Sequence, residues 1–173
     1  ELRLLANVDS LTGAINRGHF MELAKKEIQR SIRYNRKLSL VLMDMDSFKK
    51  INDNYGHASG DQALITLTRI CARGTRKMDV FARLGGEEFA LLLPETPQEI
   101  AAELSERLRE VLASSVIQSE SFEIKTTISM GVTEFGIQEQ DTFEGLFHRA
   151  DKALYKAKVD GRNCVVMWHK GLG

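Results

Sequence analysis

The hydrophobic pattern of the chain alternates between short apolar runs and longer segments with helical spacing. Residues 38–45 (LSLVLMDM) form a continuous apolar run, which is typical of a strand buried on both faces. Between residues 18 and 34, apolar side chains recur at the spacing of one helix face. The same criteria predict further helices over residues 47–54, 60–73, 97–116 and 142–158.

The remaining apolar runs predict strands. Residues 79–93 contain two such runs, VFARL and FALLL, on either side of Gly85-Gly86, and they predict a hairpin. Residues 122–135 hold two strand-like stretches in which Gly131 indicates a bulge or bend, and residues 163–168 predict a last strand. Strands that alternate with helices predict an α/β (α+β) fold, in which helices cover a mixed central sheet.

The length of 173 residues corresponds to one domain, and the content of 43% hydrophobic and 28% charged residues is ordinary for a globular protein. We expect residues 1–8 to be the end of an upstream linker or signalling helix, 9–168 to be the domain and 169–173 to be a tail. Because the sequence begins at Glu1, we expect it to be part of a longer protein.

Charge and cysteine content narrow the function classes. The 24 basic and 24 acidic residues balance, which argues against a general nucleic-acid binder and against a polybasic membrane-surface domain. The two cysteines are far apart, so a zinc site and a disulfide framework are not expected and a reducing compartment fits. Neither a spanning segment nor a signal peptide is visible. We expect a cytoplasmic domain, although missing upstream parts could tether the whole protein to a membrane.

The apolar strand ends in two acids. Asp44 and Asp46 can face the same side of a strand, and a carboxylate at the end of a buried strand is typical of ligand sites in α/β sheets. The helix that begins near Ser47 offers backbone N–H groups to a phosphate, and Lys49 could add a positive charge. We expect Asp46 to cap this helix instead. Asp44 is costly to bury without a partner and is the stronger ligand candidate.

The hairpin tip reads GGEEF over residues 85–89. Two glycines allow a tight turn and close approach of a ligand, whereas Glu87 and Glu88 repel each other unless a cation holds them. Mg²⁺ is the cation indicated. If the hairpin pairs beside the Asp44 strand, three carboxylates converge as in two-metal phosphoryl transfer. Taken alone, the tip could be only a polar turn, and the lack of a Walker A motif disfavours a P-loop enzyme.

Five motifs in order resemble those of GGDEF domains, the catalytic domains of diguanylate cyclases. They are DSLTGAINR (9–17), DMDSFKKINDNYGHASGD (44–61), RLGGEEF (83–89), SMGV (129–132) and ADKALYKAKVDGRN (150–163). The resemblance implies a palm-like fold similar to class III nucleotidyl cyclases, with a five-stranded mixed sheet and an extra hairpin. It also implies condensation of two GTP molecules into cyclic di-GMP with release of two pyrophosphates.

The resemblance also implies a metal site and catalytic residues. Asp44, Glu87, Glu88 and the carbonyl of Met45 would bind Mg²⁺, with Mn²⁺ as an alternative. Glu87, Glu88 and Lys49 would be catalytic, with Glu87 as candidate general base for the 3′-hydroxyl. A bound metal ion could lower the hydroxyl pKa enough that a separate base matters little.

The substrate residues follow from the same match. Asn52 and Asp61 would read guanine, since a carboxylate accepts from N1–H and the exocyclic amino group, which adenine does not offer in that arrangement. The full set is Phe48, Lys49, Asn52, His57, Asp61, Leu64, Gly85, Gly86, Lys158 and Arg162. Without the match, His57 could be a structural residue at a helix start, and Lys158 would be interpreted as a solvated surface lysine.

A second site is implied by an RxxD pattern. Arg76 and Asp79, joined by Arg107, match the product-inhibition site of the family, where cyclic di-GMP would bind. An arginine fork can bind guanine O6 and N7, although RxxD alone is usually a surface ion pair. Bound product could cross-link two domains and hold the active half-sites apart.

The reaction joins two GTP molecules symmetrically, so a homodimer with a two-fold axis would assemble the active site. An upstream sensor domain would control this encounter. The alternative is a catalytically silent module that senses GTP or cyclic di-GMP. A purely structural dimerisation domain would leave Asp44, Glu87 and Glu88 without a physical reason.

Overall fold

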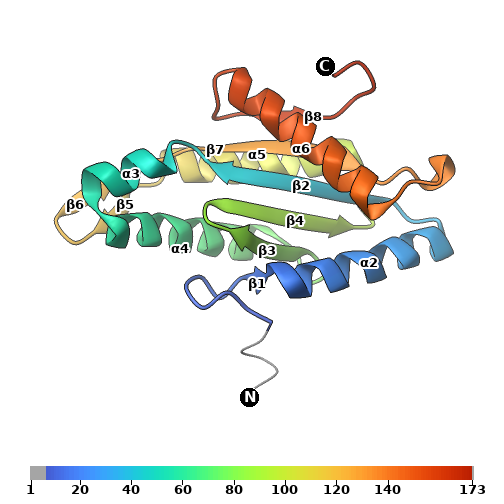
Figure 1. Ribbon diagram of the computed structural model, residues 1–173, viewed down its shortest axis with the longest axis horizontal. Helices are drawn as coiled ribbons and strands as arrows, with labels where there is room; N and C mark the ends of the chain where they lie inside the picture. Colours follow the sequence, from blue (N-terminus) through green and yellow to red (C-terminus); the bar gives the residue numbers. More distant parts are fainter. Residues whose placement is uncertain (1–6, 173) are drawn as a thin grey trace.

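The structure is a computed structural model that describes residues 7–172. A mixed sheet is covered by helices on both faces (Figure 1). The described elements are β1 (Ile15–Asn16), α2 (Arg17–Tyr34), β2 (Leu38–Met45), α3 (Phe48–Tyr55), α4 (His57–Gly74), β3 (Val80–Gly85), β4 (Glu88–Pro94), α5 (Gln98–Ser114), β5 (Ile117–Ser119), β6 (Phe122–Ile124), β7 (Ile128–Glu134), the 3₁₀ helix η1 (Ile137–Glu139), α6 (Phe143–Val159) and β8 (Val165–Met167). The predicted α/β fold class is confirmed.

The main sheet has six strands in the order β1-β3-β4-β2-β7-β8, where five were expected. The central strand β2 pairs antiparallel with β4 and β7, whereas β1 and β8 run parallel to β3 and β7. The strand that the sequence did not predict is β1, whose two residues are too short to show a pattern and are ordered by pairing with β3. A separate hairpin, β5–β6, lies at one end of the molecule next to α3 and α4 (Figure 1).

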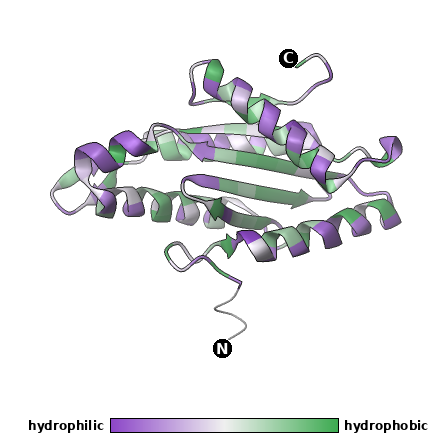
Figure 2. Ribbon diagram, viewed as in Figure 1, coloured by the Kyte–Doolittle hydropathy of each residue, from purple (hydrophilic) through white to green (hydrophobic). Residues whose placement is uncertain are grey.

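The strand β2 is buried along its whole length, as its apolar run predicted. Val41 and Met43 pack in the core with the helices α4 and α5, and Leu40 and Leu42 pack on the other face with α2 and α6. In Figure 2 the strands are mostly hydrophobic, whereas the helices carry polar stripes. The side chains of β2 therefore join both halves of the core and fix the position of the strand end that carries Asp44.

Gly131 allows α6 to approach the sheet closely. The predicted bulge at this position is wrong, because the β2–β7 register continues through the pair Leu42–Gly131. A Cβ at Gly131 would lie 2.2 Å from the backbone nitrogen of Leu154 and 2.3 Å from the carbonyl oxygen of Ala150. Glycine is required here by the approach of a helix backbone rather than by a bend in the strand.

The ends of the chain bear on two predictions. Most of the helix end predicted over residues 1–8 lies outside the described residues, and Val8 pairs with Ile15 in an isolated bridge. After β8, residues 169–172 contain a turn.

Within residues 7–172, no helix combines the length and the apolar character needed to cross a membrane.

Candidate active site

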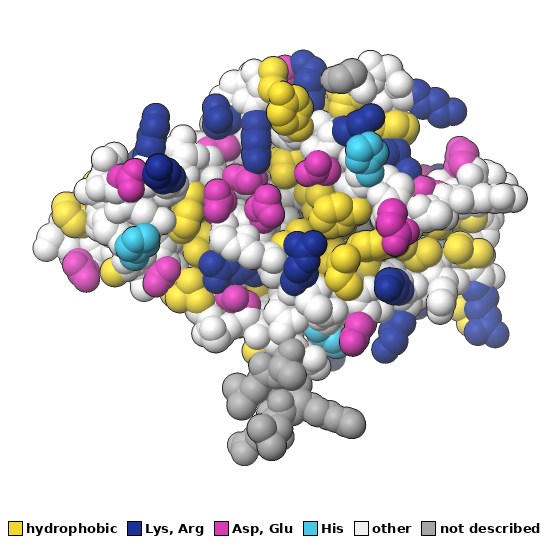
Figure 3. All heavy atoms as spheres, in the orientation of Figure 1, with side chains coloured by type: hydrophobic (Ala, Val, Ile, Leu, Met, Phe, Trp, Pro, Cys, Tyr) yellow, Lys and Arg dark blue, Asp and Glu magenta, His cyan; other side chains and the backbone are white. Residues whose placement is uncertain are grey.

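The acidic hairpin tip lies beside the end of β2. Asp44 is paired in register with Glu88 on β4 and with Ser129 on β7. The backbone N–H of Met45 donates to the carbonyl of Glu87 at 3.2 Å, which fixes the tip against the strand end. Acidic side chains gather in this region of the surface (Figure 3). The sequence predicted that three carboxylates converge if the hairpin pairs beside the Asp44 strand, and this pairing is confirmed.

Asp44 is a buried carboxylate with one cationic partner. The residue is 9% exposed, and Lys158 Nζ donates to its Oδ2 at 2.8 Å. Burial raises the pKa of Asp44, and the charges of Glu87 and Asp46 raise it further, whereas Lys158 lowers it. Because the net shift is upward, one lysine does not fully offset burial and the neighbouring acids. A further cation would stabilise the ionised form.

The residues around Asp44 fit a divalent cation by donor type. Carboxylate and carbonyl oxygens are the ligands that Mg²⁺ and Mn²⁺ prefer, and burial together with the neighbouring acids raises the pKa of Asp44, which a bound cation would oppose. Glu87 is partly exposed and Glu88 is exposed. Within the described part of the chain, no three His, Cys, Asp or Glu side chains come together closely enough to hold a metal ion. If Glu87 and Glu88 are ligands, as predicted from the sequence, their side chains must turn toward Asp44 to complete the set.

Asp46 does not cap α3, so that prediction is wrong. Ser47 occupies the N-cap position, and its side chain makes no cap hydrogen bond. The Asp46 carboxylate instead accepts from Ser129 Oγ at 2.6 Å, from Thr127 Oγ1 at 2.7 Å and from the backbone N–H of Asn163 at 3.0 Å. These partners lie 81 to 117 residues away in the sequence, so no local pattern indicated them.

The helices α3 and α4 bring the predicted guanine contacts into one region. The Oδ1 atom of Asn52 is buried and makes no hydrogen bond. Gly60, the residue before Asp61, packs against this atom so closely that a Cβ there would lie 2.0 Å from it. Packing by Gly60 was not predicted from the sequence. An unpartnered buried acceptor is costly, and a ligand that donates to it would remove the cost.

The other predicted substrate residues differ in exposure. Leu64 is 1% exposed and belongs to the hydrophobic core, so it does not present an open wall in this conformation. Phe48 is half-buried beside Gly60, whereas Lys49 and His57 are exposed at the starts of α3 and α4. The exposed Gly85 and Gly86 have φ of 147° and 53°, which a tight turn requires. Among the predicted phosphate contacts, Lys158 reaches Asp44 and Arg162 is exposed in the loop after α6.

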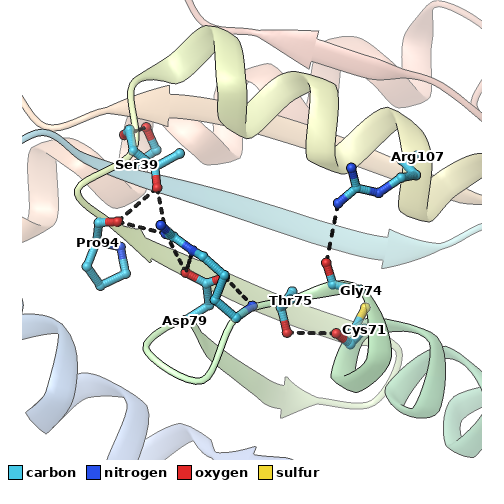
Figure 4. A network of polar contacts seen from close by, with 9 residues as sticks. Ser39, Cys71, Gly74, Thr75, Asp79, Pro94 and Arg107 are labelled. Atoms are coloured by element: carbon cyan, nitrogen blue, oxygen red, sulfur yellow. Dashed lines mark hydrogen bonds and ion pairs between the residues drawn. The ribbon is translucent and has the colours of Figure 1, made fainter.

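The RxxD residues meet in a separate cavity of about 360 Å³, which Arg76, Asp79 and Arg107 all line. Arg76 Nη2 donates to Asp79 Oδ1 at 2.8 Å and to the carbonyl of Pro94 at 2.9 Å (Figure 4). The side chain of Asp79 is 1% exposed and also accepts from the backbone N–H of Arg76 at 2.7 Å. Arg107 Nη2 donates to the carbonyl of Gly74 at 3.4 Å. The structure thus brings the three predicted product-site residues together.

A mixed sheet covered by helices, with an acid at the end of its central strand and an acidic hairpin beside it, is the arrangement of palm-like nucleotidyl-cyclase domains. A family model described as "Diguanylate cyclase, GGDEF domain" matches residues 6–164. The chain therefore belongs to the GGDEF domain family.

Relatives and solved structures agree with this assignment. Diguanylate cyclase DgcM of Escherichia coli K12 is 39% identical over 166 residues, which are 96% of this chain and 39% of the relative. The chain therefore spans about two-fifths of that protein. The coiled coil and GGDEF domain of DgcB from Caulobacter crescentus, in complex with c-di-GMP, is similar with a TM-score of 0.91 and 28% identity, covering 96% of this chain and 87% of that one. The active GGEEF domain of a diguanylate cyclase from Vibrio cholerae is similar with a TM-score of 0.84 and 31% identity, covering 90% and 98%.

Proposed function

We propose that this domain is a diguanylate cyclase, which condenses two GTP molecules into cyclic di-GMP and releases two pyrophosphates. The observation that carries the proposal is the end of β2, where buried Asp44 is in register with Glu88 and contacts Lys158. This arrangement places acidic residues for a cation beside a basic residue for a phosphate. The names of the relatives support the same activity.

Asp44, Glu87, Glu88 and the carbonyl of Met45 would hold the divalent cation, Mg²⁺ or Mn²⁺. When bound, such a cation polarises phosphoryl oxygens and lowers the pKa of a nearby hydroxyl. Lys158 would then exchange its bond with Asp44 for one with the triphosphate, joined by Arg162 and Lys49. Glu87 would accept the proton of the attacking 3′-hydroxyl, or orient that hydroxyl where the cation already acidifies it.

Guanine selectivity would come from the contact between α3 and α4. Asn52 offers a buried acceptor without a partner, and Asp61 offers a half-buried carboxylate. Both accept from N–H donors that guanine has on one edge and that adenine lacks in this arrangement. Phe48 and His57 would flank the base, Leu64 would support it from the core, and the turn at Gly85 and Gly86 leaves room for the nucleotide to approach.

The reaction requires two copies of the domain. Each chain would bind one GTP, and the two 3′-hydroxyls would attack the two α-phosphates across a two-fold axis. The curated relatives are longer than the region that matches this chain. We propose that a sensor region outside this domain controls the encounter of two copies.

Both cysteines are unpaired, which agrees with a cytoplasmic location.

Cyclic di-GMP would inhibit the enzyme at the cavity of Arg76, Asp79 and Arg107. The Arg76 guanidinium would exchange its bond to the Pro94 carbonyl for guanine O6 and N7. Asp79 is held in place by the backbone N–H of Arg76 and can accept from the other guanine edge. The structure of DgcB in complex with c-di-GMP supports product binding by a relative.

The variant Glu88→Ala tests the metal assignment. It should abolish conversion of GTP in the presence of Mg²⁺ and leave the unfolding midpoint unchanged, because Glu88 is exposed. Glu22→Ala, which removes an exposed glutamate from α2, is the matched control and should retain full activity. Substantial turnover by Glu88→Ala would refute the assignment. A folded, unaltered domain that binds GTP without converting it would favour the silent sensing module.

A further inference from the structure

Asp46 is a buried acid that the proposed reaction does not use. It is 7% exposed, and both of its carboxylate oxygens accept hydrogen bonds. Two of its three donors belong to Thr127, just before β7, and to Ser129 within β7, while the third is the backbone N–H of Asn163. Asp46 therefore joins the end of β2 both to the neighbouring strand and to the loop that follows α6.

That loop has an unfavourable backbone conformation. Gly161, Arg162 and Asn163 have φ of 111°, 65° and 47°, so two residues with side chains lie in the left-handed region. Such residues are costly and persist only where the surroundings hold them. The loop also contains Arg162, a proposed triphosphate contact, and it follows the end of α6 where Lys158 contacts Asp44. What holds this loop therefore sets the position of Arg162, next to the last turn of α6 that carries Lys158.

A residue of α5 holds the loop from the other side. Arg109 Nη1 donates to Asn163 Oδ1 at 2.8 Å. The Arg109 side chain is 14% exposed, and its Nε donates to Glu106 Oε2 at 3.0 Å, which fixes the guanidinium. Asn163 is therefore held twice, through its backbone by Asp46 and through its side chain by Arg109.

We propose that Asp46, Asn163 and Arg109 form a clasp that positions Arg162 near the end of β2, beside the turn of α6 that carries Lys158. The inference rests on the proposed function, because it assigns the clasp a role in GTP binding. Arg109 is a positioning residue in this account: it contacts neither the proposed metal ligands nor the guanine contacts, yet it sets the affinity for the triphosphate.

A double-mutant cycle tests the role of the clasp. Arg109→Ala removes the donor, and Asn163→Gly removes the acceptor while glycine still tolerates the positive φ. The probe is a GTP analogue with a methylene group between its α- and β-phosphates, titrated by calorimetry. Each single variant should bind it about three- to tenfold more weakly, because the lost hydrogen bond is exposed and its net contribution is that of an ordinary hydrogen bond. The double variant should be no weaker than the weaker single variant, because both changes break the same bond.

Controls separate positioning from general stability. Arg109→Lys retains a donor and should bind with intermediate affinity. Arg36→Ala removes an exposed arginine whose contact with Glu95 is 4.0 Å long, and it should bind like the unaltered chain. Amide hydrogen exchange should be faster over residues 160–163 in Asp46→Asn and in Arg109→Ala. In all binding-deficient variants, kcat should fall less than the affinity.

The outcomes distinguish the clasp from the proposed function. If the unaltered chain binds no GTP analogue, the proposed function fails and the inference fails with it. If the unaltered chain binds and both single variants bind equally well, the inference alone is overturned. It is also overturned if the two effects on affinity simply add, or if exchange over residues 160–163 is unchanged.

Discussion

Replacing Gly60 with alanine should weaken GTP binding by displacing Asn52. A Cβ at Gly60 would lie 2.0 Å from Asn52 Oδ1, 3.1 Å from its Cγ and 3.1 Å from Phe48 Cζ. An ordinary contact needs about 3.4 Å, so the amide must retreat by about 1.4 Å. Misplacement of about 1 Å at a reacting or binding group can cost up to about a hundredfold. We expect GTP affinity to fall by about tenfold or more.

Stability should change much less than affinity. Alanine is favoured over glycine within a helix by roughly 1 kcal/mol, which offsets part of the strain that the new Cβ causes in α4. The assay is calorimetric titration with the non-reactive GTP analogue, together with urea unfolding. The matched control is Gly18→Ala in α2, where the nearest atom to a new Cβ is Asn16 Oδ1 at 3.7 Å. Gly18→Ala should stabilise the fold and leave affinity unchanged. Unchanged affinity in a folded Gly60→Ala variant would refute the role assigned to Asn52.

Three further predictions concern other parts of the chain. Gly131→Ala should lower the free energy of unfolding by about 1–3 kcal/mol or more in urea titrations, because its Cβ would meet the backbone of α6 at 2.2 Å; unchanged stability would contradict the close approach. Burial raises the pKa of Asp141, but hydrogen bonds, chiefly from Arg149, lower it below the ordinary 3.8. The ionised Asp141 therefore stabilises the folded chain above that pH, and this contribution is lost as the pH falls through the folded-state pKa. Asp141→Asn should therefore destabilise the fold by roughly 1–3 kcal/mol at pH 7. In thermal unfolding, the difference in stability between the variant and the unaltered chain should shrink below about pH 3.8, and a difference that stays constant with pH would contradict this. Arg76→Ala should remove inhibition by added cyclic di-GMP while the initial rate of GTP conversion is retained, and persistent inhibition would refute the product site.

The parts of the fold that the sequence predicted depend on local patterns. The continuous apolar run of β2 is typical of a strand buried on both faces, and two apolar runs around Gly85 and Gly86 are typical of a short hairpin. Asp44 was identified because an ionised acid at the end of such a strand is costly without a partner. These features depend on neighbouring residues and on burial, so they can be inferred without knowledge of the tertiary packing.

The features that the sequence did not predict depend on contacts between distant segments. Asp46 is a residue type that often caps helices, yet its hydrogen-bond partners are 81 to 117 residues away, at the start of β7 and in the loop after α6. Gly131 is a residue type that often marks a bulge, but glycine is required here because the backbone of α6 lies against it. Ile15–Asn16 is too short to show a period and is ordered by β3. In each case the deciding atom belongs to a segment whose position a local pattern does not specify.

The most direct test of the central claim is the rate of cyclic di-GMP formation as a function of protein concentration. Bound nucleotide is removed first, GTP and Mg²⁺ are added, and the product is followed by chromatography. We expect cyclic di-GMP to form at a rate that rises more steeply than linearly with protein concentration, because two domains must meet. A rate strictly proportional to concentration throughout the dilute range would contradict assembly of the site from two copies. A folded chain that forms no cyclic di-GMP at any concentration would contradict the proposed activity.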